Sequence, residues 1–192
     1  MNILLINGSP RKDGNTKQAL QLMGTVFKKE GLNPIHIQLG GMNVCGCKSC
    51  GACWKNKNKK CIVQDDLTKI MEQVFDPNTK GIVVGSPTYF SNMTTEVKAF
   101  IDRCGYVALA NGGLLKGKVG TPVVICRRAG ASFTYAGINY FFGINQMPIA
   151  TSNYWNLSIA AKAGDIQKDT EGLKTFEQLA SNMSLMIKKL NS

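Results

Sequence analysis

Apolar residues recur along the chain in two alternating patterns, short continuous runs and longer stretches with helical spacing. The run at residues 2–6 (NILLI) is apolar after its first residue and stops at Asn7-Gly8-Ser9-Pro10. Such a run followed by turn residues is typical of a strand buried on both faces that leads into a loop. Further strands are predicted at residues 34–39, 81–85, 119–126 and 147–151.

Helical spacing fills most of the stretches between these strands. The clearest case has apolar residues at i, i+3, i+4, i+7 and i+8: Leu67, Ile70, Met71, Val74 and Phe75. Just before it lie Asp65 and Asp66, two acids suited to a helix amino terminus. Comparable stripes predict helices at residues 19–27, 97–104, 132–142 and 173–190. Strands that alternate with helices indicate a doubly wound α/β fold, a five-stranded parallel sheet with helices on both faces. A ligand is expected at the carboxyl ends of its strands.

One segment interrupts this alternation, a cysteine-rich insertion at residues 40–64 after the second strand. No repeat or low-complexity linker divides the chain, so residues 1–192 are predicted to form a single domain. The apolar runs are far shorter than the roughly 20 residues that span a bilayer. The amino terminus also lacks the basic and apolar regions of an export signal. We therefore expect a cytoplasmic protein that does not cross a membrane.

Charge and histidine content narrow the possible chemistry. The chain has 23 basic and 12 acidic residues, and its net charge of +11 favours anionic partners such as nucleotides, phosphates, nucleic acid or an anionic surface. The one histidine, His36, falls in a strand pattern on the face opposite two isoleucines. A solvated strand histidine is the simplest interpretation, and it argues against a histidine-based triad or a multi-histidine metal site.

The loop after the first strand, residues 7–16 (NGSPRKDGNT), carries candidate phosphate ligands. It lacks both the Walker pattern and GxGxxG, which argues against ATP hydrolysis and a Rossmann dinucleotide site. Its hydroxyl, amide and backbone N–H groups lie just before a predicted helix, where the helix dipole favours a phosphate and Arg11 adds a positive charge. The same residue types also serve as ordinary turn and cap residues.

Two further loops follow central strands and suit a planar ligand. Residues 86–93 (SPTYFSNM) contain Tyr89 and Phe90, which can lie against a flavin ring or, alternatively, form a packing or oligomer contact. Residues 127–131 (RRAGA) combine small residues, which permit close approach, with two arginines. Their guanidinium groups can balance a reduced, anionic flavin or the phosphates of a pyridine nucleotide.

Together these loops resemble the NADPH-dependent FMN reductase branch of the flavodoxin-like superfamily, and the similarity extends over nearly the whole chain. The resemblance implies bound FMN, with NADPH or NADH as co-substrate, in a homodimer or homotetramer. By position, the resemblance implies that the FMN phosphate is bound by Ser9, Arg11, Asn15 and Thr16. It implies that the ring is bound by Pro87, Thr88, Tyr89 and Phe90. Three further cofactor-binding residues are implied in the third loop: Arg128, Ala129 and Gly130.

Five of the seven cysteines lie between residues 45 and 61. Three of them are spaced by two residues and a fourth follows after seven, a spacing typical of a run that wraps an iron-sulfur cluster. Nearby lysines would offset the negative charge of such a cluster. Zinc and free or redox-active thiols remain open alternatives. Cys104 and Cys126 lie on apolar stripes and are expected to be small core residues.

This spacing resembles the iron-sulfur flavoproteins, a subgroup of the same family in which four cysteines bind a 4Fe-4S cluster beside the FMN. The residue-by-residue match gives Cys47, Cys50, Cys53 and Cys61 as ligands, and Cys45 is an additional thiol. The seven-residue last gap is at the long end of the pattern.

These features predict an FMN-dependent oxidoreductase that transfers electrons from NAD(P)H to a small acceptor of the flavin or quinone type, with relay through the cluster where one is bound. No catalytic side chain is assigned, because hydride transfer to flavin requires stacked rings and an oriented carrier rather than an acid-base residue. One alternative is a non-enzymatic electron carrier supplied by ferredoxin. A redox-sensing nucleic-acid-binding protein suits the charge, but the chain lacks a recognition motif and interleaved aromatic residues.

Overall fold

The computed structural model describes all 192 residues and contains one sheet of five parallel strands. The strands are β1 (Asn2–Asn7), β2 (Asn33–Gln38), β3 (Thr79–Pro87), β4 (Val119–Cys126) and β5 (Leu157–Ile159). Their order across the sheet is β2-β1-β3-β4-β5, the doubly wound order of flavodoxin-like proteins. The predicted fold class is therefore confirmed. The order reverses between β1 and β3, and a ligand is expected at the edge where these strands end.

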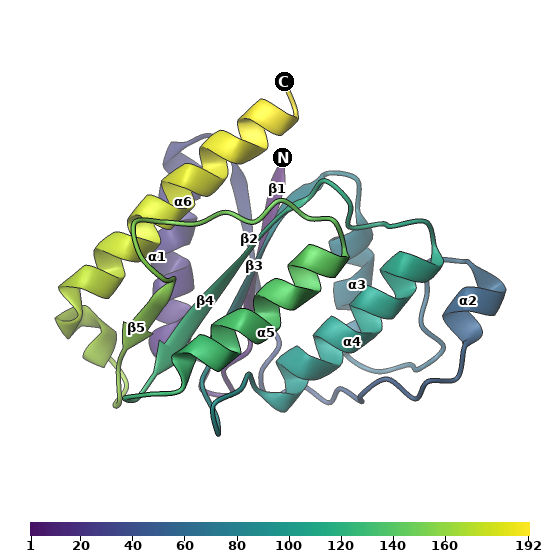
Figure 1. Ribbon diagram of the computed structural model, residues 1–192, viewed down its shortest axis with the longest axis horizontal. Coiled ribbons are helices and arrows are strands. Elements are labelled where there is room, and N and C mark those ends of the chain that lie inside the picture. The colour runs from purple at the N-terminus through teal and green to yellow at the C-terminus, as the bar shows by residue number, and fades with distance from the viewer.

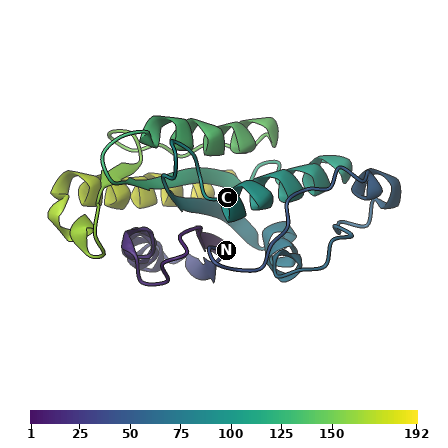
Figure 2. The same cartoon turned by 90° about the horizontal axis from the view of Figure 1, so that it is seen from below.

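Helices cover both faces of the sheet (Figures 1 and 2). The two that share the first face are α1 (Asn15–Lys29) and α6 (Thr170–Leu190). The three that pack on the second face are α3 (Leu67–Phe75), α4 (Thr95–Ala110) and α5 (Ala131–Ile144). Short elements complete the chain, α2 (Ala52–Asn56) in the cysteine-rich segment and the 3-10 turn η1 (Asp165–Lys168) before α6.

The core has two parts, one on each face of the sheet, because side chains of a strand alternate between faces. Along β1, Ile3 and Leu5 pack against α1 and α6, whereas Leu4 and Ile6 pack against α3, α4 and α5. All four are fully buried. The continuous apolar run that predicted a strand buried on both faces is therefore confirmed.

The predicted fifth strand at residues 147–151 is wrong. Within it, Ile149 forms only an isolated bridge to Gly120, and Pro148 has no N–H to contribute to a longer ladder. The fifth strand lies further along the chain, where Leu157 pairs with Val124 near the carboxyl end of β4. This correction matters for the site, because it brings the loop after β5 to the same edge as the loops after β1, β3 and β4.

Of the two acids predicted at the start of α3, one bonds to the helix and the other bonds to the insertion. Asp65 Oδ1 accepts a hydrogen bond from Leu67 N–H at 3.1 Å, as expected at a helix start, but Asp66 Oδ2 accepts one from Asn43 N–H at 2.9 Å. The insertion is also less irregular than predicted, since it contains α2. Figure 1 shows α2 beside α4, away from the lower edge where the strands end.

No helix in the structure is both long enough and apolar enough to span a membrane.

Candidate functional site

Loops at the carboxyl ends of β1, β3, β4 and β5 enclose a cavity of about 290 Å³, which we call the strand-tip cavity. Its lining residues are Ser9, Arg11, Gly14, Asn15, Thr16, Pro87, Thr88, Tyr89, Ile125, Arg127, Ala160, Ala161 and Ala163. Seven of the sequence-predicted site residues are among them. The structure thus brings together the predicted phosphate loop and most of the predicted ring loop, although they lie far apart in the sequence.

The first loop is held by side chains at the ends of β1 and β2. Asn7 Oδ1 accepts a hydrogen bond from Ser9 N–H at 3.1 Å, and Asn7 Nδ2 donates to Gln38 Oε1 at 2.7 Å. Gln38 Nε2 in turn donates to the Ser9 carbonyl at 2.8 Å. Because Asn7 and Ser9 are also buried, the loop is fixed before any ligand arrives.

The amino terminus of α1 opens into this loop with no side-chain cap. Gly14 is the N-cap residue, and no side chain accepts a hydrogen bond from the first turn. The first backbone N–H groups of a helix have no partner within the helix, so those of Asn15 and Thr16 are available to a ligand. Thr16 and Ser9, which are 2% and 4% exposed, carry hydroxyl groups and line the same cavity.

Asn15 lines the cavity, but its side chain already has partners. Its Nδ2 donates to the Lys162 carbonyl at 2.8 Å, and its Oδ1 accepts a hydrogen bond from Gly164 N–H at 2.9 Å. The side chain therefore ties the loop after β5 to the start of α1. A phosphate contact by Asn15 remains a prediction, and its backbone N–H is the group free to make it.

The second loop turns sharply after β3. Tyr89 and Asn92 exchange backbone hydrogen bonds of 2.8 and 2.9 Å across the turn, and both central residues, Phe90 and Ser91, have positive φ angles of 48° and 60°. Turns of this kind normally use Asn-Gly, and residues held in left-handed conformations concentrate at functional sites. Tyr89 lines the cavity, whereas Phe90 is fully exposed outside it.

The third loop supports the second loop more than it lines the cavity. Gly130 has a φ of 85°, and a Cβ atom there would lie 2.5 Å from Ser91 Oγ. Arg127 is the member of this loop that lines the cavity, while Arg128, Ala129 and Gly130 stand outside it. Their predicted role in binding stays a prediction.

Six lining residues were not among the site residues predicted from the sequence. They are Gly14, Ile125, Arg127, Ala160, Ala161 and Ala163. The alanines had no recognisable signal of their own, and only a correct position for β5 could have placed them at this edge.

A second, smaller cavity of about 80 Å³ lies in the cysteine-rich segment, and we call it the cysteine cavity. All four predicted metal ligands line it: Cys47, Cys50, Cys53 and Cys61. Burial raises the pKa of the Cys53 thiol, and the nearby Cys47 and Cys61 raise it further. The α4 side of the cavity is formed by Arg103, Tyr106 and Val107. Cys45 does not line it, and Cys104 and Cys126 are buried in the core, as predicted.

The two cavities share no lining residue. In Figure 1 the loops after β1, β3 and β4 lie at the lower edge of the molecule, whereas α2 lies beyond α4 at the side. The sites are therefore separate within one chain.

The family model described as NADPH-dependent FMN reductase matches residues 1–162, most of the chain. The chain belongs to this family. Relatives of the chain within this family include iron-sulfur flavoproteins. One from Methanocaldococcus jannaschii is 28% identical, with 98% of both chains covered. Another, from Archaeoglobus fulgidus, is 32% identical, with 95% of this chain and 94% of the relative covered.

Solved structures with the same fold include RosB, with a TM-score of 0.77 and 15% identity over 100% of this chain and 80% of that one. A WrbA-like flavodoxin from Agrobacterium tumefaciens has a TM-score of 0.68 and 10% identity over 98% of both chains. At these identities the likeness concerns the fold alone. It agrees with the flavodoxin-like strand order of this FMN reductase family member.

The residues of the strand-tip cavity fit FMN, the cofactor of the family. Two arginines and several hydroxyl groups line it, and no carboxylate does, so the lining suits a phosphate dianion. Tyr89 and Pro87 offer flat apolar surface for a ring.

The cysteine cavity fits an iron-sulfur cluster in its donor chemistry, because four thiols face one space. Ser49 N–H also donates to Cys47 Sγ at 3.4 Å, the kind of contact that surrounds cluster ligands. No group of three or more His, Cys, Asp or Glu side chains is drawn together closely enough to hold a metal ion. A 4Fe-4S cluster does not require such a group, because each of its four cysteines binds a different iron atom.

Proposed function

We propose that this protein is an FMN-dependent oxidoreductase that passes electrons from NADPH or NADH to a small acceptor of the flavin or quinone type. The observation that carries the proposal is the strand-tip cavity, in which an uncapped helix amino terminus, buried hydroxyl groups and an aromatic loop face one space. FMN bound there supplies hydride acceptance from the nicotinamide and electron donation to the acceptor. RosB, which shares the fold, holds a riboflavin-5′-phosphate derivative in its structure.

The chain's own residues would divide this work among three loops. Ser9, Thr16 and the first N–H groups of α1 hold the phosphate, and Arg11 balances its charge. Residues 87–89 support the ring, and Arg127 stabilises the negative charge that the ring gains on reduction. We assign Phe90, which is exposed at the tip of the second loop, to the outer face of the ring.

We further propose that Cys47, Cys50, Cys53 and Cys61 hold a 4Fe-4S cluster, which supplies one-electron exchange. The four thiols around one cavity and the iron-sulfur flavoprotein relatives support this assignment. Because the two cavities share no lining residue, the relay we propose is electron transfer between separate sites.

Protein purified without oxygen tests both assignments by its visible spectrum. We expect flavin absorbance and a broad brown shoulder that bleaches with dithionite. Stopped-flow mixing with NADPH or NADH should then bleach the flavin. Failure of both nucleotides to do so removes the reductase activity, and protein that takes up no FMN removes the assignment of the strand-tip cavity.

A second candidate function, a non-enzymatic electron carrier supplied by ferredoxin, is favoured by the charge around the cysteine cavity. Five exposed lysines lie along this segment: Lys48, Lys55, Lys57, Lys59 and Lys60. A basic rim of this kind suits an acidic protein partner. Fast, salt-sensitive reduction by ferredoxin together with slow oxidation of NADPH and NADH would favour the carrier over the reductase.

We also propose that the protein is a homodimer or homotetramer. Helix α5 contains no charged residue, and Phe133, Tyr140 and Ile144 on it are 71%, 75% and 65% exposed. Large exposed apolar side chains on one helix are typical of a protein interface. Sedimentation equilibrium should give a mass of two or four chains, and a monomer at micromolar concentration would overturn this proposal.

A further inference from the structure

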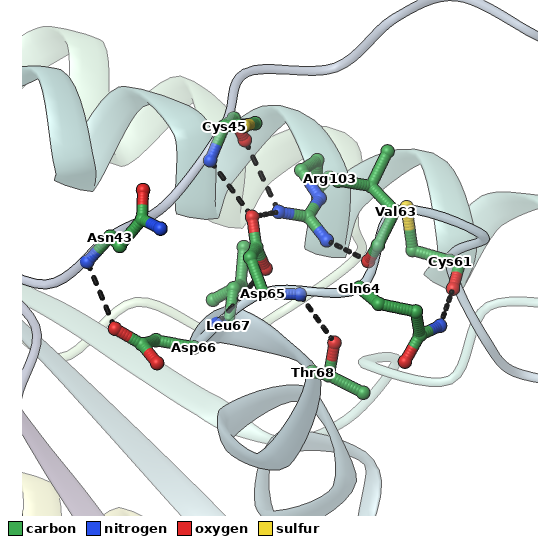
Figure 3. Close-up of polar contacts among 10 residues, drawn as sticks. All are labelled: Asn43, Cys45, Cys61, Val63, Gln64, Asp65, Asp66, Leu67, Thr68 and Arg103. Atoms are coloured by element: carbon green, nitrogen blue, oxygen red, sulfur yellow. Dashed lines mark hydrogen bonds and ion pairs between the residues drawn. The ribbon is translucent and has the colours of Figure 1, made fainter.

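Arg103 on α4 is a charged side chain with only 1% of its surface exposed. Its guanidinium forms an ion pair with Asp65, with 2.5 Å between Nη1 and Oδ2, and the Asp65 side chain is itself 5% exposed. Nη1 also donates to the Cys45 carbonyl at 3.2 Å, and Nη2 donates to the Val63 carbonyl at 2.8 Å (Figure 3). A buried arginine with three acceptors is costly to disrupt.

These acceptors lie just outside the four predicted cluster ligands. Cys45 comes two residues before Cys47, and Val63 comes two residues after Cys61. Asp65 Oδ2 joins the two ends a second time, because it also accepts a hydrogen bond from Cys45 N–H at 2.8 Å. Arg103 and Asp65 therefore close the segment that carries the ligands into a loop and fasten both of its ends to α4.

One atom of Arg103 has no role in this arrangement. Its Nε is buried and has no hydrogen-bond partner, although Arg103 lines the cysteine cavity. A buried N–H group without an acceptor is rare in native proteins and calls for an explanation such as a missing ligand. An electron-rich sulfur in the cavity would be a suitable acceptor.

We propose that Arg103 is a positioning residue for the 4Fe-4S cluster, an inference that rests on the cluster site proposed above. Its two Nη groups hold the ends of the ligand segment, and its Nε–H donates to a sulfur atom of the cluster or of its ligands. Arg103 lines the cavity and Asp65 does not, so the positive member of the ion pair is the one beside the cluster. This charge stabilises the added electron of the reduced form and raises the reduction potential.

Two variants and a matched control test the inference in the full-length, FMN-loaded protein. Arg103→Lys keeps the charge but loses the planar fork that reaches three acceptors. The double variant Arg103→Met with Asp65→Asn removes both charges, so that no buried charge is left unpaired and folding is protected. Lys98→Met is the control, because Lys98 lies on the same helix in an exposed ion pair with Asp102.

The first readout is the cluster itself after anaerobic reconstitution. We expect a chelator to strip iron from both Arg103 variants about 10-fold faster than from the wild type. The midpoint potential, followed by electron paramagnetic resonance, should shift to more negative values, and further in the double variant than in Arg103→Lys. Lys98→Met should match the wild type in both measurements. FMN content serves as the control for folding.

The second readout does not require a cluster. Before reconstitution, trypsin should cut at the lysines of residues 48–60 faster in the Arg103 variants than in the wild type and Lys98→Met. If the Arg103 variants bind FMN and match the wild type in iron loss, midpoint potential and proteolysis, the inference about Arg103 is wrong but the cluster site still stands. Wild-type protein that binds FMN but takes up no iron or sulfide overturns the cluster site, and with it the inference. That result is recognised in the wild type without reference to any variant.

Discussion

The strand-tip cavity and the cysteine cavity differ in what holds them. The strand-tip loops continue the sheet directly: Thr88 N–H donates to the Ile125 carbonyl at 2.8 Å, and Gln38 on β2 supports the first loop. The cysteine segment has no place in the sheet, and its two ends are held to α4 by Arg103 and Asp65. Loops that are hydrogen-bonded to strands thus have their binding conformation before a ligand arrives. A segment that lies outside the sheet and is held at its two ends reaches its binding conformation when its ligand binds.

The largest expected effect is a loss of cluster binding at the cysteine cavity that leaves FMN binding at the strand-tip cavity unchanged. Cys50→Ser should abolish cluster binding, because a hydroxyl replaces one of four thiolate ligands, while FMN binding is retained. Iron, sulfide and FMN analysis of reconstituted protein measures this. Cys45→Ser is the matched control, since the Cys45 thiol lies outside the cavity, and it should keep its iron. Equal iron content in Cys50→Ser and Cys45→Ser would contradict the ligand assignment.

A backbone substitution tests how rigid the strand-tip frame is. Gly130→Ala introduces a side chain at a φ of 85° and a Cβ 2.5 Å from Ser91 Oγ, so the second and third loops must separate. We expect a loss of about 1–3 kcal/mol in unfolding free energy, with weaker FMN binding. Gly143→Ala on α5, the helix that follows Gly130, should not destabilise the protein, because a Cβ there meets nothing within 4 Å. Urea denaturation compares them, and similar midpoints for the two variants would speak against a rigid frame.

A smaller effect concerns the phosphate. Arg11→Ala should weaken FMN binding about 10-fold, the effect of losing roughly one charge-assisted hydrogen bond, and should leave riboflavin binding unchanged. Titration by flavin fluorescence quenching measures both. Lys12→Ala, next along the loop but outside the cavity lining, is the control. Equal losses for FMN and riboflavin would show that Arg11 does not contact the phosphate.

The smallest expected effect is a pH dependence at the cysteine segment. Burial raises the pKa of Asp65, but hydrogen bonds from Arg103 and Cys45 N–H lower it more, so it lies below its usual value in the folded protein. Its stabilising contribution is therefore complete above the unfolded pKa of about 3.9 and is lost as the pH falls through the folded value. The difference in unfolding free energy between wild type and Asp65→Asn should shrink as the pH falls below about 4. A pH-independent difference would contradict this.

Periodicity was sufficient to predict most of the fold, because nearly every element buries one face or two. Four strands and the five long helices appear close to their predicted positions, with ends that differ by a few residues. The fifth strand could not be predicted, since Leu157–Ile159 is three residues long and shows no alternation that could be recognised. Its position is fixed by pairing with β4, a tertiary effect.

The same limit applies to the sites. Residues grouped in one loop, such as Ser9 with Thr16 or Thr88 with Tyr89, could be identified because neighbours in sequence stay neighbours in space. Arg103 could not, since it reaches Asp65 across 38 residues and its helix stripe marks it only as a polar position. Ala160 and its neighbours join the cavity only through the position of β5.

The most direct test of two separate sites in one chain is a crystal structure of protein purified and reconstituted without oxygen in the presence of FMN. We expect the phosphate on the N–H groups at the start of α1 and the ring beside Tyr89. The cluster should lie on Cys47, Cys50, Cys53 and Cys61, with Arg103 Nε beside one of its sulfur atoms. FMN bound away from the strand-tip cavity, or iron held by other residues, would contradict the account.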